Sequence, residues 1–162
     1  MNKSLILILF LLLFTSCNSG VALGTPGDSN INIVFVVDSS GSMGENNKME
    51  VTRNALTRSI DLLPDNANVG ILEFASSTEW IYPIGMLNRQ EISEQIKRIS
   101  SAGGTTIGNA MHEATTALVA HREHFPGNKQ TATFRIVLMT DGQNSGGKNP
   151  LEVIPEVKHN GQ

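Results

Sequence analysis

A run of small polar residues follows directly on an apolar stretch near the N-terminus. Asp38-Ser39-Ser40-Gly41-Ser42 comes immediately after Ile33-Val34-Phe35-Val36-Val37, and such an apolar run is typical of a strand buried on both faces of a parallel sheet. Folds that alternate strands and helices bind ligands at the carboxyl ends of such strands. Because the donors are oxygen atoms of one carboxylate and its neighbouring hydroxyls, they suit Mg²⁺, Mn²⁺ or Ca²⁺ better than zinc or copper.

Two later segments bring further oxygen ligands toward the same place. Asp141 follows the mostly apolar stretch 133–139, which predicts another strand. In a doubly wound sheet, the loops after these two strands meet where the strand order reverses, so Asp38 and Asp141 are expected to face one another and to share a cation that offsets their repulsion. The glycine-containing loop 101–106 opens toward the same edge. The predicted ligands, with waters completing an octahedron, are Asp38, Ser40, Ser42, Thr105 and Asp141.

Together these segments resemble the metal-ion-dependent adhesion site of von Willebrand factor A domains. The motif Asp38–Ser42, then Gly103-Gly104-Thr105, then Thr140-Asp141-Gly142 occur in the order of that family, and the resemblance covers Ile31 to the C-terminus. It implies that the five predicted ligands hold a divalent cation, some directly and some through water, with Mg²⁺ or Mn²⁺ expected before Ca²⁺. Thr106 is the alternative to Thr105.

The predicted chemistry favours binding over catalysis. Uncharged hydroxyls supply much of the shell, so the ion keeps positive charge and an exchangeable water position that an Asp or Glu of a partner protein can take. The sequence offers no nucleophile–base pair. One alternative is a haloacid dehalogenase-type phosphatase with Asp38 as nucleophile, but Ser40 stands where that class has its second Asp. Another is a scaffold of the same fold without metal. We therefore predict a protein-binding module for adhesion or assembly, and no enzyme.

The elements that must position these residues alternate along the chain. Apolar residues at helical spacing predict helices over 49–63, 92–99 and 107–121, and apolar runs predict strands over 69–74, 78–84 and 133–139. Asn88 and Glu91 form a capping box before the second helix. The short link between 69–74 and 78–84 predicts an antiparallel edge strand. The fold class is therefore α/β, a doubly wound, mainly parallel, Rossmann-like sheet with one antiparallel edge strand.

The N-terminal segment predicts export and anchoring. Residues 1–17 resemble a bacterial lipoprotein signal peptide, with a charged start, a short apolar region and Cys17 as the lipidation site. Residues 18–30 predict a flexible linker, and 31–162 the domain. We expect an extracytoplasmic protein held on a membrane of the cell envelope, or a secreted one if Cys17 is not lipidated. A net charge of −3 without charge runs, and 5% aromatic residues, predict no nucleic-acid binding.

The C-terminal segment reads as one more helix, from Pro150, with Pro155 inside it. Relative to the family resembled here, the final strands are missing, so we expect either a C-terminally truncated domain or a fragment of a larger protein. The strand 133–139 would then be an exposed apolar edge, and the isolated chain less stable than a full family member. The sequence does not predict an oligomeric state.

Overall fold

β1 (Ile31–Asp38) is an inner strand of a four-stranded sheet with the order β3-β2-β1-β4 within the described part of the chain. The computed structural model describes residues 31–142 and 144–160. β2 (Asn68–Phe74) and β4 (Thr133–Met139) pair with β1 in parallel, and β3 (Thr78–Met86) pairs with β2 antiparallel at the edge. The predicted α/β class, the mainly parallel sheet and its antiparallel edge strand are confirmed.

β1 is buried because its side chains are apolar on both faces. Val34 and Val36 point into one hydrophobic cluster, and Phe35 and Val37 point into the other. All four are at most 2% exposed. A strand of this kind requires covering elements on both sides of the sheet, and it ends at Asp38, the only charged residue of β1.

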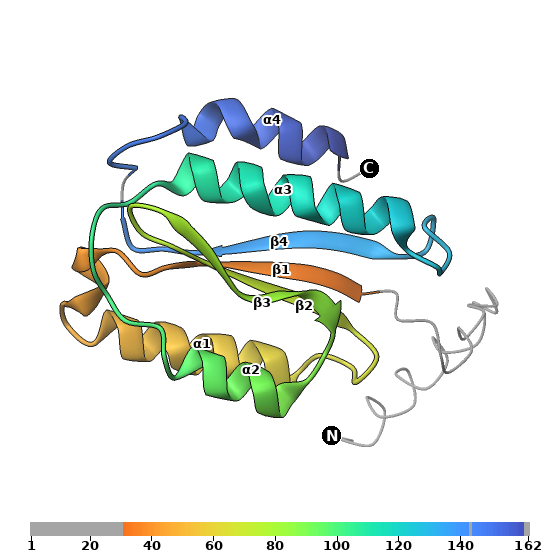
Figure 1. Cartoon of the computed structure of the whole chain (residues 1–162), viewed down its shortest axis with the longest axis horizontal. Helices are drawn as coiled ribbons and strands as arrows, with labels where there is room; N and C mark the ends of the chain where they lie inside the picture. Colours follow the sequence, from red (N-terminus) through yellow and green to blue (C-terminus); the bar gives the residue numbers. More distant parts are fainter. Residues whose placement is uncertain (1–30, 143, 161–162) are drawn as a thin grey trace, which may run out of the picture.

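Helices cover the two faces of the sheet (Figure 1). α1 (Lys48–Asp61) and α2 (Arg89–Ile96) lie on one face, with Leu56 and Ile92 in the core beneath them. α3 (Ile107–His124) covers the other face through buried residues that include Ala110, Ala114 and Leu118. α4 (Pro150–Asn160) packs against the outer side of α3 (Figure 1). This arrangement leaves the carboxyl ends of the parallel strands β1, β2 and β4 together at one edge of the molecule.

A buried polar cluster lies at the opposite end of β1. Asn32, which is 0% exposed, accepts a hydrogen bond from Asn68 Nδ2 at 2.9 Å and donates to the Thr133 carbonyl O at 3.2 Å. Its Oδ1 also lies 3.0 Å from His121 Nε2. The cluster therefore joins β1, β2, β4 and α3.

Most predicted elements match the structure, and one local segment differs. The residues after Asp38 were expected to form a loop, but Gly41–Gly44 is a 3₁₀ helix, η1, because Met43 N–H bonds the Ser40 carbonyl and Glu45 N–H bonds the Ser42 carbonyl. The Asn88 side chain caps α2 by accepting from Glu91 N–H, as predicted. β4 lies at the other edge of the described sheet, with side chains half-buried to exposed.

The helix predicted from Pro150 is present and includes Pro155. The signal peptide with Cys17 and the linker 18–30 lie outside the described residues. Among the residues described, no helix is both long enough and apolar enough to span a membrane.

Candidate metal site

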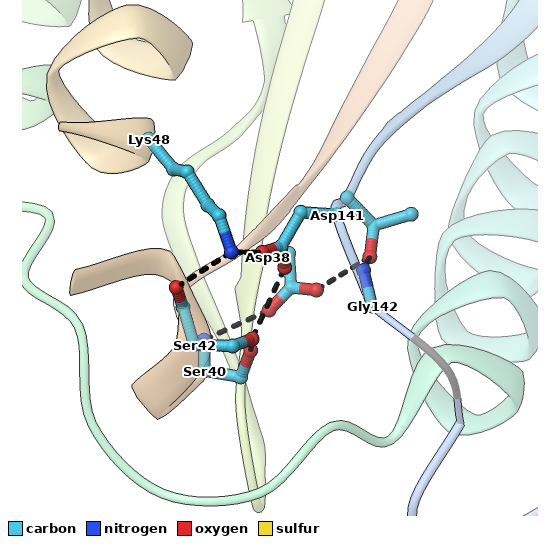
Figure 2. A network of polar contacts seen from close by, with 7 residues as sticks. Asp38, Ser40, Ser42, Lys48, Asp141 and Gly142 are labelled. Atoms are coloured by element: carbon cyan, nitrogen blue, oxygen red, sulfur yellow. Dashed lines mark hydrogen bonds and ion pairs between the residues drawn. The ribbon is translucent and has the colours of Figure 1, made fainter. Parts of the chain in front are cut away.

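Asp38 lies at the buried base of the candidate site. Its side chain is 0% exposed, and each carboxylate oxygen has a neutral donor: Ser40 N–H bonds Oδ1 at 2.8 Å, and the Thr140 hydroxyl bonds Oδ2 at 2.5 Å (Figure 2). The donor from Thr140 comes from the end of β4, which pairs with β1. A backbone N–H of the following turn and a hydroxyl at the end of the neighbouring strand thus fix the orientation of Asp38.

Two serine hydroxyls connect this base to Asp141. Ser40 Oγ lies 3.2 Å from Ser42 Oγ, and the Ser42 hydroxyl donates to Asp141 Oδ1 at 3.1 Å (Figure 2). The turn of η1 brings these alternate serines side by side, because its first residue follows Ser40 and its second is Ser42. The structure therefore brings Asp38, Ser40, Ser42 and Asp141 into one hydrogen-bonded network.

Asp141 lies at the rim and is paired with a cation of the chain itself. Lys48 Nζ lies 2.5 Å from Asp141 Oδ2 and also donates to the Ser42 carbonyl O at 3.3 Å. The hydrogen bond from Lys48 holds the pKa of the Asp141 carboxyl below its ordinary value, and the same bond raises the pKa of the Lys48 ammonium. Both groups stay charged at neutral pH.

Of the two candidate threonines, Thr105 is the one whose side chain lies near the same point as Asp38. The Thr106 hydroxyl donates to the Ala75 carbonyl O at 2.8 Å and is therefore occupied elsewhere. Thr105 is 7% exposed. A Cβ added to Gly142 would lie 3.8 Å from Thr105 Oγ1 and 3.7 Å from Asp38 Oδ2, so these two oxygens flank the same point.

Backbone contacts fix the loop that carries Thr105. Gly41 N–H bonds the Gly103 carbonyl at 3.0 Å, and Ala102 N–H bonds the Ser39 carbonyl at 2.8 Å. Gly103 has a φ of +79°, a conformation that favours glycine. On the other side, Thr105 N–H donates to the Ser145 hydroxyl at 2.8 Å. The loop is thereby held to both the β1 end and the β4 end of the site.

The donor chemistry of this cluster fits a hard divalent cation. Every side-chain ligand candidate offers oxygen, and only two of the five, Asp38 and Asp141, are carboxylates. Correspondingly, the described residues contain no group of three or more His, Cys, Asp or Glu side chains placed to hold a metal. A mixed carboxylate and hydroxyl shell is the kind that Mg²⁺ and Mn²⁺ accept, with water filling the remaining positions.

Sequence reasoning missed Lys48, Thr140 and Ser145. Thr140 had a signal, since it sits beside Asp141 at a strand end. Lys48 had a weaker one, a cation at the first position of a helix, where the helix dipole disfavours positive charge. Ser145 had none, because its contact with Thr105 joins residues 40 positions apart.

A family model for the von Willebrand factor type A domain matches residues 32–162. The chain belongs to this family. It is 34% identical over 140 residues to inter-alpha-trypsin inhibitor heavy chain H4 from Bos taurus, an alignment that covers 81% of this chain and 15% of that protein. This von Willebrand factor type A chain thus spans less than a fifth of the length of that relative.

Solved structures share the same fold. Conserved hypothetical protein BatB from Bacteroides thetaiotaomicron is 24% identical, with a TM-score of 0.64 over 81% of this chain and 62% of that one. Proximal thread matrix protein 1 from the mussel byssus, in a structure with a zinc-occupied MIDAS motif, is 18% identical, with a TM-score of 0.69 over 83% of this chain and 36% of that one. At these identities the likeness shows the fold.

Proposed function

We propose that this domain is a divalent-cation-dependent protein-binding module. The observation that supports it best is the convergence of oxygen ligands from three separate segments on one network at the carboxyl edge of the sheet (Figure 2). The residues that would hold the ion, preferably Mg²⁺ or Mn²⁺, are Asp38, Ser40, Ser42, Thr105 and Asp141.

The uneven exposure of the network suggests how a partner binds. Asp38 and Ser40 are buried, at 0% and 1% exposed, and form the floor. Asp141 lies at the rim, with its side chain 20% exposed. A bound dication with only two carboxylate ligands keeps positive charge and offers a position to a carboxylate from outside. We therefore propose that the partner is a protein that presents an Asp or Glu side chain to this rim.

The surroundings of Asp38 argue against the phosphatase alternative. A phosphoryl-accepting carboxylate must be exposed to a phosphate ester, whereas Asp38 is fully buried. The residue two positions later is Ser40 and cannot serve as the acid or base of that class.

A metal-free scaffold is a second candidate, favoured by one observation. The Lys48 ammonium already neutralises Asp141, so the network is closed by groups of the chain alone. A direct measurement of metal binding distinguishes the metal-dependent module from the metal-free scaffold.

We also propose that the module is tethered outside the cytoplasm. The support is the lipoprotein-like pattern of residues 1–17 with Cys17, followed by the linker-like segment 18–30. Metabolic labelling with a radioactive fatty acid tests this proposal, since a Cys17→Ala variant is expected to lose the label.

The metal proposal is tested by titrating Mn²⁺ into the full chain in a mild detergent and measuring free Mn²⁺ by electron paramagnetic resonance. We expect Asp141→Asn, which keeps the shape but removes the charge, to weaken binding by about 10- to 100-fold. The matched control is Asp61→Asn, at the opposite end of α1 from Lys48. The proposal would be contradicted if the wild-type protein bound no Mn²⁺ at millimolar concentration, or if Asp141→Asn bound Mn²⁺ as tightly as wild type. Either result would favour the metal-free scaffold.

A further inference from the structure

Lys48 neutralises the carboxylate at the rim of the candidate metal site. Its Nζ lies 2.5 Å from Asp141 Oδ2 and 3.3 Å from the Ser42 carbonyl O, while Asp141 Oδ1 accepts from the Ser42 hydroxyl. Figure 2 shows the ammonium reaching across to Asp141 from the helix that follows η1. Both oxygens of Asp141 are therefore engaged by this chain, and one of them by a full positive charge.

The backbone before Lys48 places it at this position. Asn46 and Asn47 adopt φ angles of 52° and 61°, in the left-handed region that Asn enters more readily than most residues. These two residues turn the chain from η1 into α1, so that Lys48 becomes the first residue of the helix. A cation is disfavoured there by the helix dipole. The ion pair with Asp141 offsets this unfavourable interaction between the Lys48 charge and the helix dipole.

A lysine in this position competes with a metal ion for the same oxygen. A divalent cation on the network needs an oxygen of Asp141, but Oδ2 holds the ammonium and Oδ1 faces Ser42. If Lys48 stays, it places a like charge within a few ångströms of the dication, which raises the energy of the bound state. If it leaves, the ion pair is lost. The Lys48 side chain is 34% exposed, and its flexible stem lets the ammonium move into water.

We propose that Lys48 is an internal counter-ion of Asp141 that competes with the divalent cation, so that it sets the metal affinity of the site. This inference rests on the proposed function of the same site. With Lys48 present, the carboxylate is neutralised at low metal concentration, and the ion binds only when its concentration is high enough to compete. The chain thereby tunes its binding to the surrounding divalent-cation concentration.

The test compares Mn²⁺ affinities of the full chain in detergent, measured by electron paramagnetic resonance at fixed pH and ionic strength. Lys48→Met keeps the stem and removes the charge, and we expect it to bind Mn²⁺ about tenfold more tightly, as expected when a unit positive charge is removed from a few ångströms away. Lys48→Arg keeps the positive charge beside Asp141, so we expect it to bind Mn²⁺ no more tightly than wild type. Lys129→Met, in the loop between α3 and β4, controls for the change in net charge.

A second readout checks that these variants are folded and that the metal acts on the native state. The Mn²⁺-dependent rise in melting temperature, relative to a chelator, is expected to be larger in Lys48→Met than in wild type at the same Mn²⁺ concentration. The inference is supported if Lys48→Met binds Mn²⁺ more tightly than wild type while Lys48→Arg and Lys129→Met do not. It is also supported if Lys48→Met is the one protein of the set that binds Mn²⁺ measurably.

Equal or weaker Mn²⁺ binding by Lys48→Met overturns the inference while leaving the proposed metal site in place. Tighter binding by both Lys48→Met and Lys129→Met also overturns it, because overall charge would then be the cause. If neither wild type nor any variant binds Mn²⁺, the proposed function itself fails and the inference fails with it.

Discussion

Asp38 and Asp141 carry the same functional group in contrasting surroundings. Asp38 is buried and is hydrogen-bonded to a backbone N–H and a hydroxyl, whereas Asp141 lies at the rim and pairs with Lys48. In the proposed site, Asp38 is a fixed ligand and Asp141 is the one whose partner changes when metal binds. Their convergence was predictable, because parallel strands on either side of a reversal in strand order end at the same edge.

The position of the Lys48 ammonium could not be predicted in the same way. A lysine stem has four rotatable bonds, and its direction here depends on two consecutive left-handed residues, Asn46 and Asn47. Nothing in hydrophobic periodicity encodes that turn. The hydrogen bond from the Thr106 hydroxyl to the Ala75 carbonyl, which favours Thr105 as the ligand, is likewise a tertiary contact that the sequence does not predict.

The two adjacent threonines provide a matched test at this scale. We expect Thr105→Val to weaken Mn²⁺ binding by about tenfold or more, because it removes an oxygen that flanks Asp38 while keeping the shape of the side chain. Thr106→Val removes the bond to the Ala75 carbonyl and is expected to lower the free energy of unfolding by about 1 kcal/mol, without changing metal affinity. Mn²⁺ titration and urea unfolding of both variants check this, and the reverse pattern would assign the site to Thr106.

The apolar pattern of the sequence predicts most helices and strands, but it does not predict how closely they pack against one another. The core positions of α1, α2 and α3 repeat at helical spacing, so the sequence predicts which faces are buried. Gly108 in the first turn of α3 carries no such signal. A Cβ there would lie 2.0 Å from the carbonyl O of Lys148, so the glycine is required by the close approach of the segment before α4.

Gly108→Ala tests this approach between elements. Because the added methyl meets backbone and cannot be relieved by a side-chain rotation, we expect a loss of about 1–3 kcal/mol in the free energy of unfolding, measured by urea denaturation. Gly146→Ala is the control in the same segment, since a Cβ there has nothing within 4 Å. Equal stability of the two variants would show that the segment moves freely away from α3.

At the scale of the whole molecule, the two ends of β1 have separate roles. The candidate site occupies the carboxyl end, and the buried Asn32 cluster joins the sheet to α3 at the amino end. His121 of this cluster packs beside Phe125, with 6.1 Å between ring centroids. Burial lowers the pKa of the His121 imidazole below its ordinary value of 6.5.

This lowered pKa predicts a pH dependence of stability that is independent of the metal site. Below about pH 6.5 the unfolded chain binds a proton at His121 that the folded chain does not yet bind, so the free energy of unfolding falls as the pH decreases and levels off below the folded-state pKa. Urea unfolding from pH 7.5 to 5.5 is expected to show this slope in wild type and in His124→Gln, and a smaller slope in His121→Gln. Identical slopes in all three proteins would contradict it.

The long sequence separation within the site has a consequence for the order of folding. Asp38 meets Thr140 across 102 positions, and Ser42 meets Asp141 across 99. The ligands are therefore dispersed in the unfolded chain and assemble only when β4 docks beside β1, an event of high contact order. During synthesis, the proposed set of ligands is incomplete until nearly all the described residues have left the ribosome. A divalent ion at the proposed site would therefore not guide the early steps of folding; it would add its binding energy only to the finished domain.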